Sequence, residues 1–459
     1  MKILFITKYE YYEPNGIMSL SAMLKQNGHE CDLVDLSLSK DYLREIRAFN
    51  PDIIAYSIYT GRHTFYLRLN LELKRKFSFL AVFGGPHATF FPQMIEEKGV
   101  DVLCRGEGEH AIVELANALA NGADYSTIRN LWVKRAGKIQ RNELRPLIED
   151  LDSLPFIDRK IAQKYAHYRK LRRRIVLTGR GCPYDCAYCF NHIYGQLYKG
   201  KGKRIRRRSV ENVIAELKEV YAEFTPYRFV FIDDIFIMDK KWCHDFCKRY
   251  KEEIGLPFMA YTRLNLITEE LLRDLKDANC DALLYAIESG NEYIRNKVLN
   301  RNMSDGQIYE AIKLITQYGF KTFAQNMVGL PDETLEMAFE TLQMNIKCKP
   351  DFAWCSIFQP YPMTKLYHYC REKKYLANTI IGEYMFKSSV LDIKHKRELE
   401  NLHHFFSIAV AHPSLLPLVR VLIKFPLGPL YYGLWHIHRA YSLLFKVPWL
   451  YLSEVLVKE

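Results

Sequence analysis

Three cysteines are grouped in one short segment of this chain: Cys182, Cys186 and Cys189, with the spacing C-x3-C-x2-C. Three thiolates on one tight loop can hold three irons of a [4Fe–4S] cube, and the fourth iron is then left without a protein ligand. A structural zinc or an electron-carrying cluster takes four protein ligands. The missing ligand leaves a coordination site for a substrate or cosubstrate, so the spacing indicates catalysis.

The region around and after these cysteines, from residue 174 to about 362, alternates strand-like and helix-like runs. Six apolar runs have the length of buried strands, and predicted helices separate them. This pattern predicts a partial (β/α)6 barrel, because a full eight-stranded barrel usually needs about 250 residues. The predicted strands are 175–178, 229–233, 258–262, 282–287, 320–328 and 352–358.

Polar side chains stand where these predicted strands end, and barrel enzymes place their chemistry at that mouth. Asp233 and Asp234 can accept hydrogen bonds from an ammonium group, although they would suit the cap of the next helix equally well. Arg263 follows the third strand. Glu288 and Ser289 end the fourth strand, where a carboxylate could accept from ribose hydroxyls.

Three further residues extend this set. Gly329 and Glu333 lie in a Gly-Pro turn after the fifth strand, which could pass close under an adenine. Arg301 follows the fourth helix and could reach a carboxylate. Taken singly, Glu333 would suit the first turn of a helix, and Arg301 would suit the surface. Their joint occurrence after a cysteine loop favours a binding site.

Residues 1 to about 125 predict a second sheet, parallel and doubly wound, because short strands again alternate with helices. Ligands bind at the carboxyl ends of the strands in such sheets, and glycine lets a backbone approach a ligand closely. The residues at these ends are Ser57, Gly84, Gly85, Gly106 and Glu107. The predicted strands are 3–7, 31–36, 52–57, 80–83 and 102–104.

Length and composition limit the class of protein. A chain of 459 residues suggests two or three domains, and its hydrophobic fraction of 49% is that of a globular protein. Eleven cysteines are too sparse for a disulfide framework, and the N-terminus lacks the layout of a signal peptide. We therefore expect a reducing, cytoplasmic compartment.

Basic residues are concentrated in two runs, 169–174 and 199–208, on either side of the cysteine loop, and the net charge is +12. Such runs suit nucleic acid, an anionic substrate, a protein electron donor or a membrane surface. Nucleic acid is the least favoured of these partners.

Composition also divides the chain into segments. Residues 149–158 are acidic and contain proline, which favours a linker. Residues 403–459 combine apolar and aromatic stretches with prolines and basic residues, and no stretch is long enough to span a membrane. They suit either a helical cap on the barrel or an interfacial membrane segment. The expected domains are 1–140, a linker 141–170, the barrel 171–390 and a helical extension 391–459.

Together these motifs resemble the radical S-adenosylmethionine (SAM) enzymes that carry an N-terminal cobalamin-binding domain. The resemblance covers roughly residues 1 to 390, and its most specific element is the cysteine loop with Tyr188 before the last cysteine. One motif departs from the family, since Met363 stands where glycine is usual. The other matching motifs are 51–57, 84–87, 105–109, 288–290, 329–334 and 360–364.

The resemblance implies roles for individual residues. The three cysteines would ligate the cluster, and its open iron would bind the amino and carboxylate groups of SAM. Asp233 or Asp234 would hold the SAM amine, Glu288 its ribose, and the turn at Gly329 would lie near the adenine. Residues 8–16 lack the histidine with which some cobalamin domains ligate cobalt, so cobalamin would bind without a histidine lower ligand.

The leading hypothesis is a radical SAM enzyme that cleaves SAM to a 5′-deoxyadenosyl radical for cobalamin-dependent methylation of an unactivated carbon. The alternative is a radical SAM cyclase or oxidoreductase acting on a hydrophobic ring or lipid. A third is a non-catalytic iron–sulfur or nucleic-acid-binding protein. The expected partners are a small-molecule or lipid substrate, an electron donor such as flavodoxin or ferredoxin, and a membrane if the C-terminal extension is interfacial.

Overall fold

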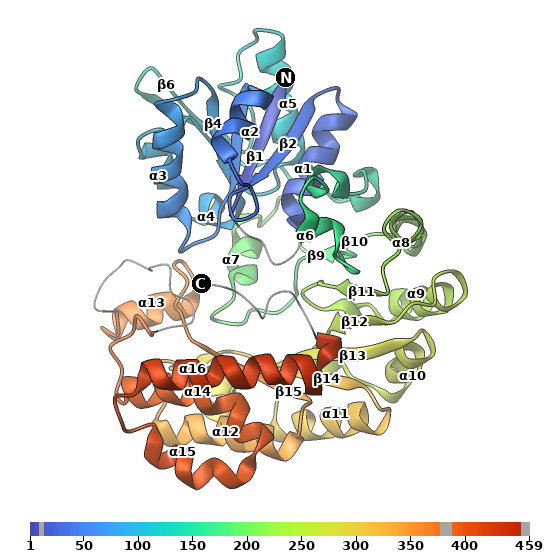
Figure 1. Ribbon diagram of the computed structural model, residues 1–459, viewed down its shortest axis with the longest axis vertical. Coiled ribbons are helices and arrows are strands. Elements are labelled where there is room, and N and C mark those ends of the chain that lie inside the picture. The colour runs from blue at the N-terminus through green and yellow to red at the C-terminus, as the bar shows by residue number, and fades with distance from the viewer. Residues whose placement is uncertain (9–12, 377–387, 451–459) are drawn as a thin grey trace. The chain divides into compact units, whose positions relative to one another are not determined.

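The computed structural model describes residues 1–8, 13–376 and 388–450 of the chain (Figure 1). The chain forms two compact units. Unit 1 consists of Met1–Leu171 and Tyr198–Arg206, and unit 2 consists of Arg172–Leu197 and Arg207–Glu459.

A seven-stranded sheet forms the centre of unit 1, in the order β2-β1-β3-β4-β5-β6-β7. The first five strands pair in parallel, which confirms the predicted doubly wound sheet, and β6 and β7 add an antiparallel hairpin. The sequence pattern does not indicate this hairpin, because β7 buries none of its residues. The strands are β1 Lys2–Thr7, β2 Glu30–Asp35, β3 Ile53–Ser57, β4 Leu80–Gly84, β5 Val102–Cys104, β6 Leu131–Arg135 and β7 Lys138–Arg141.

Helices cover both faces of this sheet. Ile3 and Phe5 of β1 belong to one apolar core, and Leu4 and Ile6 belong to another. Helices α1 and α5 supply side chains to the first core, and α2 and α3 supply them to the second. Burial on both sides explains why the strand is continuously apolar. The helices of unit 1 are α1 Asn15–Gln26, α2 Tyr42–Phe49, α3 His63–Lys74, α4 Gly85–Phe90, α5 Glu109–Ala120 and α6 Ala166–Arg169.

The segment between β7 and residue 171, which the composition suggests is a linker, packs on this sheet. Tyr168 is fully buried, and its hydroxyl donates to the Asp35 carboxylate at 2.9 Å. Arg159 forms a buried ion pair with Glu13 at 2.6 Å. An acidic, proline-containing composition indicates only the absence of long regular elements, and tertiary contacts order this segment.

Unit 2 contains a sheet of six parallel strands in the order β15-β14-β13-β12-β11-β8. The order follows the chain, and β8 and β15 form its two outer edges, so the predicted partial barrel is confirmed. The strands are β8 Arg173–Val176, β11 Arg228–Phe231, β12 Phe258–Tyr261, β13 Cys280–Glu288, β14 Lys321–Val328 and β15 Phe352–Ile357. Two-residue strands, β9 Gly179–Arg180 and β10 Arg206–Arg207, lie outside this sheet.

The connection after β13 contains two helical elements. A one-turn π-helix, η6 Ile294–Val298, is followed by the longer α11, whose first turn is closed by a capping box of Ser304 and Gln307. The remaining helices of unit 2 are α7 Phe190–Leu197, α8 Val210–Phe224, α9 Lys240–Glu253, α10 Glu269–Asp277, α11 Asp305–Gln317, α12 Leu335–Cys348 and α13 Lys365–Glu372.

The predicted C-terminal extension is helical. Helix α14 contacts the edge strand β15 and α12, with Leu402 and Phe406 fully buried, and α16 packs on α14 (Figure 1). Within the ranges that the structure describes, no helix is both long and apolar enough to cross a membrane. The elements are α14 Lys396–Ala411, α15 Leu416–Leu422, α16 Gly428–Tyr441 and the π-helix η8 Ser442–Lys446.

Candidate active site

The cysteine loop lies between β9 and α7 in unit 2, and its backbone is anchored. The Ala187 amide donates to the Leu299 carbonyl at 2.9 Å, and the Cys189 amide donates to the Cys186 carbonyl at 3.1 Å. The Asn191 amide also donates to the Cys189 sulfur at 3.5 Å.

The thiols suit an iron–sulfur cluster better than a single ion. Burial raises the pKa of Cys182 and, to about 12, that of Cys189, and the nearby charges of Asp234 and Cys186 add to both shifts. Such thiols become ligands when a metal stabilises the thiolate. In the described residues, no three His, Cys, Asp or Glu side chains converge to hold one metal ion. Each thiolate of a cubane binds a different iron, so three thiolates on one loop suit a cluster that leaves one iron open.

Arg263 places a buried cation against this loop. Its guanidinium Nη1 lies 3.8 Å from the Cys186 sulfur, and the guanidinium carbon lies 3.8 Å from the centre of the Tyr184 ring. It also donates to the Arg301 carbonyl. A buried cation therefore lies beside one of the three predicted cluster ligands.

Glu288, Arg301 and Tyr188 form a connected group at the end of β13. The Tyr188 hydroxyl donates to Glu288 Oε1 at 2.9 Å, and Arg301 Nη1 lies 2.6 Å from that hydroxyl and 3.6 Å from Glu288 Oε1. Burial raises the pKa of Glu288, and the charge of Arg301 opposes this shift. The sequence marks Tyr188 only as an aromatic residue, so its link to two predicted ligand contacts is a finding of the structure.

The two adjacent aspartates have different surroundings. Asp233 is buried and accepts hydrogen bonds from the Thr178 amide at 3.1 Å and the Thr178 hydroxyl at 2.7 Å. Asp234 is exposed, and its charge contributes to the pKa shifts of two loop cysteines. Neither caps the next helix, because Asp239 is the N-cap of α9.

The remaining predicted residues of unit 2 lie in two positions. Ser289 is fully buried, with its hydroxyl 3.5 Å from the Thr341 hydroxyl on α12. Gly329 has φ +77°, and its amide donates to Glu333 Oε2 at 2.7 Å. Burial raises the pKa of Glu333 to about 8. Glu333 therefore closes the turn, while Thr334 caps α12.

In unit 1, small residues line the ends of two neighbouring strands. Ser57 and Gly84 are paired at the ends of β3 and β4 and are half-exposed. Gly85 has φ +87°, and a Cβ there would lie 2.8 Å from the Ile58 nitrogen, so only glycine fits. The Thr89 hydroxyl supports the turn by donating to the Gly85 carbonyl at 2.9 Å.

A second turn in unit 1 is supported in a similar way. The Gly106 amide donates to the Thr89 hydroxyl at 2.9 Å, and a Cβ on Gly106 would collide with the Tyr198 hydroxyl. Glu107 forms a buried ion pair with Arg206 at 2.7 Å. The side chains of Thr89 and Arg206 thus stabilise the turn, while its backbone stays half-exposed. Residues 8–16 are the stretch that lacks a cobalt-ligating histidine, and residues 9–12 of this stretch lie outside the described residues.

Three arginines of the basic runs beside the loop are held by contacts within the fold. Arg174 is fully buried, with its guanidinium carbon 4.4 Å from the centre of the Phe224 ring. Arg206 is paired with Glu107, and Arg208 is paired with Glu216. These arginines stabilise the fold, so they offer little charge to a nucleic acid.

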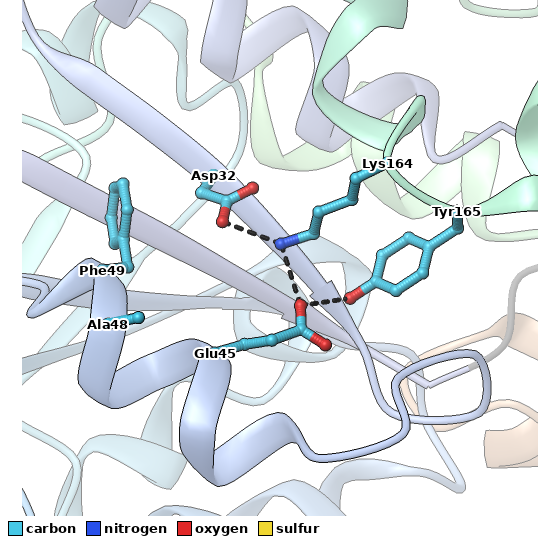
Figure 2. A pocket seen from close by; sticks show the side chains of 6 residues that line it. All are labelled: Asp32, Glu45, Ala48, Phe49, Lys164 and Tyr165. Carbon is cyan, nitrogen blue, oxygen red and sulfur yellow. Dashed lines mark hydrogen bonds and ion pairs between the residues drawn. The ribbon is translucent and has the colours of Figure 1, made fainter.

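Figure 2 shows a pocket in unit 1 whose lining includes none of the strand-end residues Ser57, Gly84 and Gly106. Lys164 bridges Asp32 at 2.7 Å and Glu45 at 3.0 Å, and the Tyr165 hydroxyl donates to Glu45 at 2.9 Å. Because the charged side chains that line the pocket pair with one another, we interpret them as a structural ion-pair cluster. Its lining residues are Asp32, Glu45, Ala48, Phe49, Lys164 and Tyr165.

Comparison with known families identifies both units. The B12 binding domain family matches residues 1–116, and the radical SAM superfamily matches residues 176–344. Over 393 residues the chain is 30% identical to uncharacterized methyltransferase PH0819 of Pyrococcus horikoshii, with 83% of each chain covered. The chain therefore belongs to the radical SAM enzymes with an N-terminal B12-binding domain. The predicted cofactors, a [4Fe–4S] cluster, SAM and cobalamin, are those of these two domains.

Two other proteins are similar over much of the chain. The anaerobic magnesium-protoporphyrin IX monomethyl ester cyclase of Rubrivivax gelatinosus is 26% identical, over 79% of this chain and 67% of the cyclase. The solved structure of the radical SAM methyltransferase TsrM from Kitasatospora setae has a TM-score of 0.68 at 17% identity, over 82% of this chain and 77% of TsrM. The second likeness shows a shared fold.

Proposed function

We propose that this enzyme transfers a methyl group to an unactivated carbon of a small-molecule substrate. The carrying observation is the cysteine loop whose own Tyr188 joins Glu288 and Arg301 in one hydrogen-bonded group. Similarity to a methyltransferase over 83% of the chain supports the same reaction.

In unit 2, we assign the cluster to Cys182, Cys186 and Cys189. Bound together, the cluster and SAM supply a 5′-deoxyadenosyl radical that removes a hydrogen atom from carbon. Asp234 is better placed than Asp233 to accept from the SAM amine, because Asp233 is committed to Thr178.

The group at the end of β13 orients the rest of SAM. Glu288 offers a carboxylate to the ribose hydroxyls, and Arg301 offers a guanidinium to the SAM carboxylate. Tyr188 and Arg301 hold Glu288 before SAM arrives, which lowers the entropy lost on binding. The turn at Gly329 brings backbone close to the adenine.

In unit 1, we assign cobalamin to the strand ends at Ser57, Gly84, Gly85 and Gly106, with Glu107 stabilising the second turn. Cobalamin supplies a cobalt centre that carries the methyl group. It would do so without a histidine lower ligand from residues 8–16. We take residues 1–140 as this domain and 171–390 as the radical SAM domain.

The electron donor and substrate follow from the same chemistry. A low-potential protein such as flavodoxin or ferredoxin would reduce the cluster, and a reducing cytoplasm would preserve it. The substrate is a small molecule or a lipid.

Ring formation or oxidation of a hydrophobic substrate is the second candidate, because the chain is also similar to an anaerobic cyclase. Both functions need radical formation, and they differ in the fate of the SAM methyl group.

The decisive experiment is anaerobic reconstitution with iron, sulfide and cobalamin, followed by one-electron reduction and incubation with SAM labelled in its methyl group and a small-molecule extract that supplies the substrate. Methyl transfer predicts 5′-deoxyadenosine, S-adenosylhomocysteine and a labelled product. Formation of 5′-deoxyadenosine alone would favour cyclisation or oxidation. No SAM cleavage by a fully loaded, reduced enzyme would exclude both functions.

A further inference from the structure

The outer side of α16 and η8 carries an exposed apolar stripe. Ile437 is 68% exposed and Phe445 is 71% exposed, although both are large hydrophobic side chains. The stripe recurs at intervals of three and four residues, which places its members on one side of a helix. Its members are Leu427, Leu430, Leu434, Ile437, Tyr441, Leu444 and Phe445.

The opposite side of the same helix is firmly packed. Tyr431 and Trp435 are buried, the Tyr431 hydroxyl donates to the Leu422 carbonyl at 2.8 Å, and the ring of Trp435 lies 5.8 Å from that of Trp354. The stripe is therefore held outward by a helix that is itself part of the folded unit. Scattered exposed apolar residues are ordinary, but a continuous row of this kind indicates an interaction surface.

The charged residues of the chain segment that carries the stripe are of one sign. The sequence contains no aspartate or glutamate between Glu400 and Glu454. Two lysines, Lys424 and Lys446, are exposed near its two ends. An exposed row of apolar side chains with lysines and without carboxylates matches the interface of an anionic bilayer.

A second copy of the chain is the rival occupant, because intervals of three and four also suit a pair of helices. A two-fold contact would bring lysine-bearing surfaces together without any carboxylate from the same segment to neutralise them. Charge complementarity therefore favours lipid over self-association.

We propose that α16 and η8 bind the surface of an anionic lipid bilayer, with the stripe among the acyl chains and Lys424 and Lys446 at the lipid phosphates. The enzyme would then be a peripheral membrane protein anchored through unit 2. This inference stands on the surface alone and does not depend on the reaction proposed above.

The test is flotation of the full-length protein with vesicles of phosphatidylcholine, with and without phosphatidylglycerol. The wild type should float with the anionic vesicles, and added salt should release it. The double variant Ile437→Ser/Phe445→Ser should lower vesicle affinity by roughly tenfold or more, because it removes two apolar side chains that would enter the acyl-chain region. Lys424→Glu/Lys446→Glu should lower it by roughly tenfold or more on anionic vesicles.

Matched controls lie elsewhere in unit 2. Tyr221→Ser removes an aromatic side chain that is 50% exposed on α8, and Lys313→Glu reverses an exposed charge on α11. Both should float like the wild type. Failure of the wild type to bind anionic vesicles would overturn the proposal, as would equal binding by the stripe variant. A dimer that dissociates only in the stripe variant, without vesicle binding, would assign the stripe to a second copy.

Discussion

The carboxyl ends of the two parallel sheets present different chemical groups. In unit 2, ionisable side chains contact one another, with Arg301 beside Glu288 and Arg263 beside Cys186. In unit 1, the strand ends present glycine backbone in the left-handed region, as at Gly85. Under the proposed assignments, unit 2 would select its ligands by charge, whereas unit 1 would select by the space beside its backbone. Substitutions in unit 2 should therefore impair cluster loading or SAM cleavage, whereas substitutions in unit 1 should impair cobalamin retention.

The largest effect is expected from Cys186→Ala in unit 2. Loss of one of three proposed cluster ligands should abolish both cluster loading and SAM cleavage, while cobalamin retention by unit 1 stays unchanged. Iron content, the visible spectrum and 5′-deoxyadenosine release measure this. Cys348→Ala, at a half-buried site on α12, is the control and should load normally. SAM cleavage retained by Cys186→Ala would contradict the assignment.

Arg301→Met should be the next most damaging change. It leaves the Glu288 carboxylate buried without its cation, which costs about 3–5 kcal/mol of folding free energy. Urea unfolding measures the loss. The double variant Arg301→Met/Glu288→Gln removes the stranded charge and should recover part of the stability but no SAM cleavage. Recovery of cleavage as well would show that Arg301 has no role in holding SAM.

Glu333 tests a turn of unit 2 that combines glycine with an ionisable group. Its folded pKa of about 8 exceeds the ordinary 4.5, so the folded state favours the protonated acid. Its contribution to stability is fully present below about pH 4.5 and is lost as the pH rises through about 8. Relative to Glu333→Gln, the free energy of unfolding of the wild type should fall between these two pH values. The fall should be about 1.4 kcal/mol for each unit by which the folded and unfolded pKa values of Glu333 differ. Urea titrations across this range, with the exposed Glu310→Gln as control, should show the slope; parallel curves for wild type and Glu333→Gln would refute it.

Gly85→Ala in unit 1 should have the smallest effect on cluster loading and SAM cleavage and a selective effect on cobalamin. The left-handed backbone costs an alanine about 1–2 kcal/mol, and its Cβ would press on the Ile58 backbone. Cobalamin retention after gel filtration should fall while cluster loading persists. Gly122→Ala, also at positive φ but in open space, isolates the backbone term. Equal cobalamin retention in both variants would mean that the Gly85 turn does not contact the cofactor.

Local patterns predict the parts of the site that depend on short stretches of chain. The spacing of the three cysteines needs one loop, and the position of Glu288 needs only the end of a buried strand. The sequence does not show that Asp233 is buried against Thr178, 55 residues away, whereas Asp234 is exposed. It also presents Glu107 as a ligand contact, whereas the structure pairs it with Arg206.

The sequence alone determines the class of chemistry and the order of the two sheets along the chain. The first follows from the spacing of the cysteines, and the second follows from apolar patterns that extend over only a few residues. Tertiary structure alone decides which polar groups face a ligand and which are satisfied within the protein. Contacts across long sequence separations, such as Tyr188 with Glu288 and Arg301, carry no local signal. The order of the strands brings them together, and burial then raises the pKa of Glu288 while the charge of Arg301 opposes that shift.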